Sequence, residues 1–122
     1  MMGRTKTALK PWQKSKKEVR AQIRGMVKRI VEQFHPDKII LFGSYARGDA
    51  GPDSDVDLLV VMPFEGRKLD KIVEIRVALS DFTVPLDILV STPEQLAVQK
   101  EIPGTAQRAA VREGKVLYVR RP

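Results

Sequence analysis

Hydrophobic residues along this chain follow first a helical spacing and then short β-rich runs, and this alternation predicts the order of its elements. Between residues 16 and 34 the apolar positions recur three and four residues apart, which is typical of one amphipathic helix. His35 and Pro36 end that pattern, because a residue before proline is disfavoured in the α region. Residues 38–42 (KIILF) then form a short run rich in β-branched residues, which favours a buried strand.

The rest of the chain continues the alternation. The further elements that the pattern predicts are strands over 55–62, 84–90 and 115–119, and helices over 68–82, from Thr92 onward and over 105–113, the last ended by Gly114. Pro85 places the 84–90 strand at an edge or at its own beginning, because proline cannot donate to the sheet ladder. Thr92, followed by proline and by Gln95, has the form of a capping box at a helix start.

This order of elements predicts an α/β (α+β) fold, with helices packed on a mixed sheet of three to four strands. Residues 44–54 leave room for about two helical turns. Such a connection is short for a parallel crossover, so the first two strands are predicted to be antiparallel. A length of 122 residues suits one domain. We therefore expect a single domain over residues 16–122, preceded by a flexible basic arm over residues 1–15.

The net charge of +7 is distributed very unevenly along the chain. Residues 1–30 hold ten Lys and Arg and one acid, a balance of +9, whereas residues 31–105 have a balance of −6 and residues 106–122 a balance of +4. A fold that binds nucleic acid through its centre would show the opposite distribution. An acidic centre instead suits carboxylates that gather cations.

Two absences in the sequence narrow the function classes. The chain has no cysteine, which excludes disulfides, zinc–thiolate sites and thiol nucleophiles together. It also has no apolar run near the roughly 20 residues that a membrane helix needs, and no secretory signal at its N-terminus. We expect a cytoplasmic protein that does not enter a membrane.

Three aspartates carry the candidate chemistry. Asp55 and Asp57 open a strand with one residue between them, so both side chains point to the same face. Asp87 interrupts the apolar run VPLDILV, where a lone carboxylate is costly unless it is paired. If the two strands are neighbours, the three acids converge, and carboxylates without histidine or cysteine suit Mg²⁺, with two such ions able to catalyse phosphoryl-type transfer.

Gly43 and Ser44 supply a candidate phosphate site ten residues earlier. A glycine before a helix start lets a phosphate approach the backbone, and the first helical amides are free to donate to it. The Ser44 hydroxyl adds a donor, and Arg47, one turn on, lies on the same face of the helix start. The site residues predicted for the nucleotide are therefore Gly43, Ser44 and Arg47.

The stretch GSYARGDAGPDSDVDLLV resembles the signature of the DNA polymerase beta-like nucleotidyltransferase superfamily, and the small size and the ending REGKVLY resemble its minimal nucleotidyltransferases. The resemblance covers about residues 20–120. It implies a phosphate-binding pair at Gly43 and Ser44 and Mg²⁺ ligands at Asp55, Asp57 and Asp87. It further implies transfer of AMP from ATP to a hydroxyl, with a tyrosine of a partner HEPN toxin as acceptor, so that the chain is the antitoxin of a toxin–antitoxin pair.

Other interpretations stay open at this stage. The acids at 55 and 57 can be solvated residues beside a turn, Asp87 can be exposed on an edge strand, and Arg47 can be an ordinary surface arginine. The chain can neutralise a partner by contact alone, or bind nucleic acid through its basic arm. The strongly basic first helix is not part of the family signature. Homo-oligomerisation is also left open. The presence of all three carboxylates favours an active enzyme.

Overall fold

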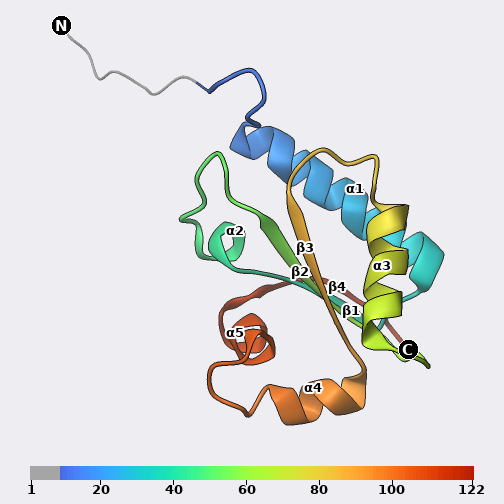
Figure 1. The fold of residues 1–122 in the computed structure, drawn as a ribbon. Helices are drawn as coiled ribbons and strands as arrows, with labels where there is room; N and C mark the ends of the chain where they lie inside the picture. The colour runs from blue at the N-terminus through green and yellow to red at the C-terminus, as the bar shows by residue number, and fades with distance from the viewer. Residues whose placement is uncertain (1–8) are drawn as a thin grey trace, which may run out of the picture.

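The computed structural model of this chain describes residues 9–122, and its elements follow the predicted order (Figure 1). They are α1 (Lys16–Phe34), β1 (Lys38–Phe42), α2 (Ser44–Arg47), β2 (Val56–Val61), α3 (Lys68–Ala78), β3 (Leu86–Ser91), α4 (Pro93–Gln99), α5 (Ala106–Glu113) and β4 (Lys115–Val119). Most of the predicted basic arm, residues 1–8, lies outside the described residues. Within the rest of the arm, Gln13 donates from its side-chain amide to Asp53, 3.2 Å away.

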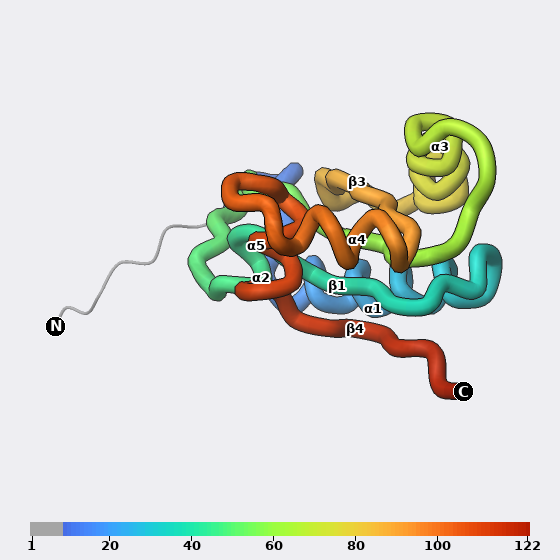
Figure 2. The backbone as a smooth tube through the Cα atoms, turned by 90° about the horizontal axis from the view of Figure 1, so that it is seen from below, coloured from blue at the N-terminus to red at the C-terminus, as the bar shows by residue number. Residues whose placement is uncertain are grey.

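The four strands form one mixed sheet in the order β3-β2-β1-β4. β1 pairs antiparallel with β2 and with β4, and β2 pairs parallel with β3. β3 and β4 therefore lie at opposite edges of the sheet (Figure 2). The predicted α+β class and the antiparallel pairing of the first two strands are confirmed. Pro85 directly precedes the edge strand β3, so both readings of that proline hold together.

Helices cover both faces of the sheet and create two apolar cores. The larger core joins α1 and α3 to one face, through residues such as Met26, Ile75 and Leu58. The smaller core joins α4 and α5 to the other face, through Leu96 and Ala110. Strands covered on both faces are apolar at nearly every position, which explains the run that follows Asp57 in β2.

α3 is shorter and more exposed than its sequence pattern predicts. It ends at Ala78 rather than at residue 82. Of its apolar residues, Ile75 is fully buried, whereas Leu69 and Val77 are 64% and 67% exposed. α3 packs chiefly on the edge strand β3, and an edge strand offers a helix a narrow apolar surface. Burying one stripe of α3 is therefore all that the sheet allows.

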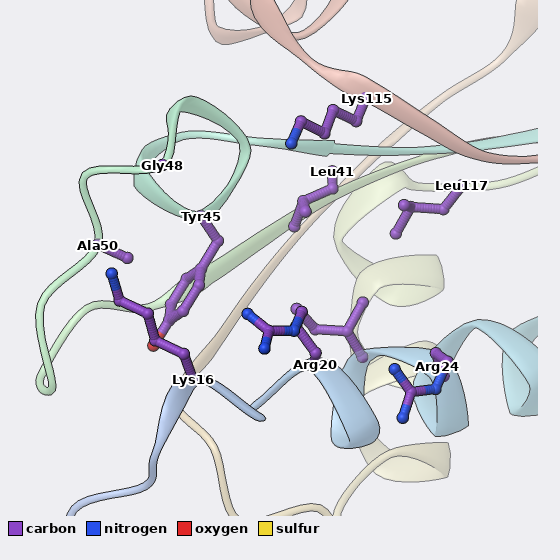
Figure 3. Close-up of a pocket in the computed structure, with 10 residues that line it drawn as sticks. Lys16, Arg20, Arg24, Leu41, Tyr45, Gly48, Ala50, Lys115 and Leu117 are labelled. Atoms are coloured by element: carbon purple, nitrogen blue, oxygen red, sulfur yellow. The ribbon is translucent and has the colours of Figure 1, made fainter. Parts of the chain in front are cut away.

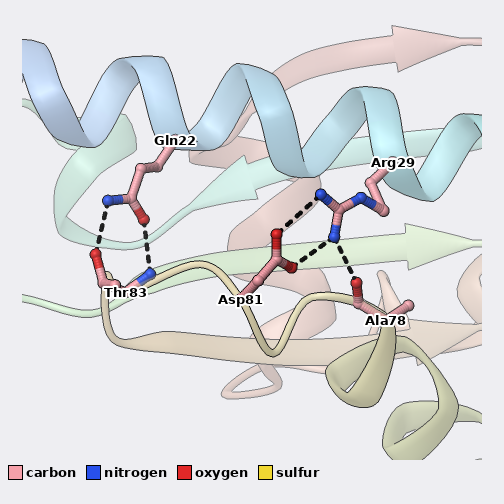
Figure 4. Close-up of polar contacts among 5 residues, drawn as sticks. All are labelled: Gln22, Arg29, Ala78, Asp81 and Thr83. Carbon is pink, nitrogen blue, oxygen red and sulfur yellow. Dashed lines mark hydrogen bonds and ion pairs between the residues drawn. The ribbon is translucent and has the colours of Figure 1, made fainter.

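α1 holds the segment between α3 and β3 in place through two polar side chains (Figure 4). The Gln22 side-chain oxygen accepts hydrogen bonds from the backbone amides of Thr83 and Val84, both at 3.0 Å. The Arg29 guanidinium donates to both carboxylate oxygens of Asp81, at 2.6 and 3.0 Å. These bonds fix the chain just before β3 and therefore help to set the position of Asp87 in the sheet.

Gly114, the predicted helix end, has a different reason to be glycine. Its φ of −78° is ordinary for any residue, so no left-handed cap is involved. A Cβ at this position would collide with the Ala110 carbonyl oxygen and lie 2.6 Å from Ile40 Cγ2. The missing side chain lets α5 approach β1 closely.

Nowhere in residues 9–122 does a helix combine the length and the apolarity that crossing a membrane requires.

Candidate active site

The acidic corner of the molecule consists of Asp55, Asp57 and Asp87. Asp57 is the second residue of β2 and Asp87 the second residue of β3, and the parallel register pairs the two directly. Partners in adjacent strands point to the same face. Alternation along β2 places Asp57 on the face of Leu59, the side of the sheet that α4 and α5 cover farther along. Asp55 lies two residues before Asp57, at the end of the preceding turn.

In the acidic corner, the charges of Asp55 and Asp87 act on Asp57. Asp57 is half-buried, whereas Asp55 and Asp87 are exposed. Burial raises the pKa of Asp57 most strongly, and the negative charges of Asp87 and Asp55 raise it further, while the positive charge of Arg47 opposes the shift. A carboxylate in this setting is stabilised by a nearby cation.

Gly43 is fixed by its position against Asp57. Its φ of 74° and ψ of −156° lie in a region that only glycine adopts without strain. A Cβ built there would collide with the Asp57 Oδ2 atom and lie 3.1 Å from its Cγ. The turn between β1 and α2 therefore touches the carboxylate at its backbone, which leaves the predicted phosphate site and the predicted metal ligand in direct contact.

Ser44 and Arg47 are the first and last residues of α2. With four residues, α2 has little macrodipole to offer a phosphate, so the candidate site depends on the glycine turn at Gly43 rather than on a helix terminus. Arg47 pairs with Asp49 across 3.3 Å, and both side chains are about half exposed. An exposed pair of this kind is weak, so the guanidinium is available to a more highly charged anion.

A divalent cation fits the chemistry of the acidic corner. Its donors are carboxylate oxygens, which Mg²⁺ prefers. Burial, and then the charges of Asp87 and Asp55, raise the pKa of Asp57, so a bound cation would favour its charged form. In residues 9–122, no three His, Asp or Glu side chains stand in a preformed metal-binding cluster. The strands are neighbours, but the three acids do not converge as closely as the sequence predicts, because carboxylates repel one another and two of these three are exposed.

Comparison with known proteins identifies the family. The nucleotidyltransferase domain matches residues 22–117, a span that contains every predicted site residue. "Putative protein adenylyltransferase MJ0604" of Methanocaldococcus jannaschii is 37% identical over 82 residues, which cover 66% of this chain and 77% of that protein. The chain therefore belongs to the nucleotidyltransferase domain family, and the enzyme class expected from the sequence is confirmed.

Solved structures support the fold. A "putative nucleotidyltransferase from Sulfolobus solfataricus" is 23% identical with a TM-score of 0.51, over 88% of this chain and 91% of the other. A toxin–antitoxin structure with AMP-PNP is 19% identical with the same TM-score, over 82% of this chain and 73% of the other. At these identities the likeness establishes a shared nucleotidyltransferase fold.

Sequence reasoning named the residues of this corner but missed the groups that hold it together. Gly43 was assigned to phosphate approach alone, and its close contact with Asp57 was not foreseen. Gln22 and Arg29 had no assigned role, although they anchor the segment before β3. Local sequence carries no signal for these contacts, since their partners lie 49 or more positions away.

Proposed function

We propose that this chain transfers AMP from ATP to a hydroxyl group on a partner protein. The observation that carries the proposal is the pairing of Asp57 with Asp87 in adjacent strands, with Asp57 packed against the Gly43 backbone, inside a nucleotidyltransferase domain. Acids and a glycine turn at one corner would bring cation ligands and phosphate donors within reach of the same triphosphate.

In the proposed reaction the acceptor oxygen forms a bond to the α-phosphorus of ATP, and the bond from that phosphorus to the bridging oxygen of the β-phosphate breaks. Pyrophosphate leaves with the bridging oxygen, and the hydroxyl proton passes to the exposed Asp87 carboxylate. Asp55, Asp57 and Asp87 hold Mg²⁺, two ions in the proposed form, which supplies positive charge to the phosphates. The backbone at Gly43, the Ser44 hydroxyl and the Arg47 guanidinium bind phosphate oxygens.

The acceptor that we propose is a tyrosine of a HEPN-type toxin, so that the chain acts as an antitoxin. Two observations support a protein acceptor and this biological setting. The relative MJ0604 carries the name of a protein adenylyltransferase, and one structural neighbour is a toxin–antitoxin structure with AMP-PNP. The position of Asp87 on an edge strand leaves the corner accessible to a large acceptor.

The test is a transfer assay with the toxin encoded beside the gene for this chain. ATP labelled at the α-phosphate is incubated with MgCl₂, the toxin and either the wild type or the D55N/D57N variant. We expect label and a mass increase of one AMP on the toxin with the wild type, and neither with the variant. D53N, which removes an acid from the neighbouring turn, is the matched control and should transfer normally.

The same variant separates catalysis from neutralisation by contact. If toxin activity is restored when D55N/D57N replaces the wild type, catalysis is needed for neutralisation. Neutralisation that survives in the double variant, with a stable complex and no label, would reject the enzymatic mechanism in favour of an antitoxin that acts by binding.

A further inference from the structure

A second charged site, the basic cavity, lies on the other side of α2. It has a volume of about 430 Å³ and is lined by Lys16, Arg20, Ile23, Arg24, Leu41, Tyr45, Gly48, Ala50, Lys115 and Leu117. Figure 3 shows Tyr45 reaching from α2 towards the start of α1, and Lys115 entering from β4 on the side opposite Arg20 and Arg24. Two elements far apart in the sequence, α1 and β4, thus bring four cationic side chains to one cavity.

Within residues 9–122, these four cations have no acidic partner in an ion pair. None of the ion pairs found in residues 9–122 involves Lys16, Arg20, Arg24 or Lys115. The three on α1 are spaced four residues apart, where like charges destabilise a helix. An anion bound in the cavity would relieve that repulsion.

The cavity is separate from the acidic corner. Leu41 and Ile23, on its floor, belong to the core between α1 and the sheet. Asp57 points to the opposite face of the same sheet, since it alternates with Leu58, which belongs to that α1 core. An anion in the basic cavity is therefore shielded from the carboxylates by the sheet and α2.

We propose that the basic cavity binds a nucleotide, at a site distinct from the ATP that is consumed at the acidic corner. Arg20 and Arg24, with Lys16 and Lys115 as further point charges, hold the phosphate, and the base lies against the Tyr45 ring and the apolar floor. The proposal does not depend on the function of the acidic corner, because none of the residues that hold the phosphate belongs to it.

Three features of the lining favour a nucleotide over a simple anion. Arginine forms paired hydrogen bonds with phosphate oxygens in a planar geometry. Ile23 and Leu41 are 6% and 7% exposed and, with Leu117 and Tyr45, give an apolar surface suited to a flat aromatic group. The volume lies within the range of about 300–1,000 Å³ typical of small-ligand sites. A bare phosphate would use the cations and leave the apolar half empty.

The experiment measures binding of radiolabelled AMP by equilibrium dialysis at low salt in the presence of EDTA. Without a divalent cation the acidic corner repels a phosphate, so the basic cavity is the site observed. We expect saturable binding of one AMP per chain, and a dissociation constant at least about tenfold larger in R20Q/R24Q, since two charge-assisted hydrogen bonds are lost. The matched control is K17Q/K28Q, which removes the same charge from the same helix at positions that do not line the cavity, and it should change the constant less than about twofold.

Further arms identify the ligand and its source. Tyr45→Leu should weaken AMP more than inorganic phosphate, because only AMP has a base to stack. A short single-stranded RNA that binds with the same dependence on Arg20 and Arg24, when free AMP does not, identifies the nucleotide as part of an RNA chain; AMP binding identifies the free form as sufficient. Thermal unfolding confirms that each variant is folded. Absence of saturable binding of both AMP and the RNA, equal losses in both double variants, or inorganic phosphate binding as tightly as AMP would overturn the proposal.

Discussion

The acidic corner and the basic cavity lie on opposite faces of the sheet, and each gathers several charges of one sign. In the corner, burial raises the pKa of Asp57 most, and the negative charges of Asp87 and Asp55 raise it further. In the cavity, four cations share a space without an ion-pair partner in the described part of the chain. Like charges held together oppose folding, so both sites indicate that something outside the chain supplies the opposite charge.

The pair of Arg29 and Asp81 is a third charged location, and here both charges belong to the chain. Arg29 and Asp81 form two hydrogen bonds, and the pKa of Asp81 is lowered chiefly by its hydrogen bond to Arg29. The pKa of an aspartate is therefore raised at Asp57 and lowered at Asp81. The charged form of Asp81 therefore stabilises the fold, whereas the charged form of Asp57 destabilises it.

The largest effect is expected for Asp57→Asn. If the proposed function holds, removing this carboxylate should lower AMP transfer by about 10³-fold or more, because metal and oxyanion stabilisation contribute several kcal/mol to such reactions. The same variant should unfold at a higher temperature at pH 7. The raised pKa means that charged Asp57 opposes folding above that pKa, an effect that fades as the pH falls towards the unfolded value. Transfer assays and calorimetry check both; a less stable variant would contradict the assignment.

Next in size is Gly43→Ala. The new side chain would be strained at a φ of 74° and would collide with Asp57. We expect a loss of at least about 2 kcal/mol in the free energy of unfolding and weaker nucleotide binding in Mg²⁺. Urea unfolding and dialysis with ATP measure the two. Gly51→Ala is the control, because the nearest atom to its Cβ is 4.0 Å away and its φ is not positive. Equal stability of the two variants would disprove the close contact at Gly43.

Asp81→Asn should have a smaller effect of the opposite sign to Asp57→Asn. Because the pKa of Asp81 is lowered in the folded state, its charge stabilises the protein above the ordinary aspartate pKa of about 3.9. That stabilisation disappears as the pH falls through the lowered folded value. The melting temperature of the variant should therefore lie below that of the wild type at pH 7 and approach it in acid. A difference that persists in acid would indicate lost packing instead of a lost charge.

The smallest effect is expected for Arg20→Gln in the absence of ligand. Arg20 lies four residues from both Lys16 and Arg24, so its removal should stabilise α1 by about 0.2–0.5 kcal/mol at low salt. The gain should vanish near 1 M salt, where charges are screened within roughly 3 Å. Lys28→Gln, at a position between Arg24 and Glu32, should show no such gain. Melting temperatures at two salt concentrations decide the matter.

Much of the fold and the acidic corner could be predicted from local signals. The bounds 38–42 and 115–119 agree with β1 and β4, and the capping box of Thr92 and Gln95 is present at α4. The neighbouring positions of Asp57 and Asp87 were predicted only on the condition that their strands are adjacent, and the parallel register meets that condition. The basic cavity could not be predicted from the sequence, because Lys115 comes beside α1 only through the pairing of β4 with β1.

The first turns of α1 make two kinds of contact, one with the basic cavity and one with the segment before β3. Its first turns supply Lys16, Arg20 and Arg24 to the basic cavity, while Gln22, on the same turns, holds the backbone of Thr83. A helix is stiff over this length, so the cations of the basic cavity and the anchor of the segment before β3 keep a fixed spacing, and a substitution that shifts the first turns of α1 is expected to disturb both.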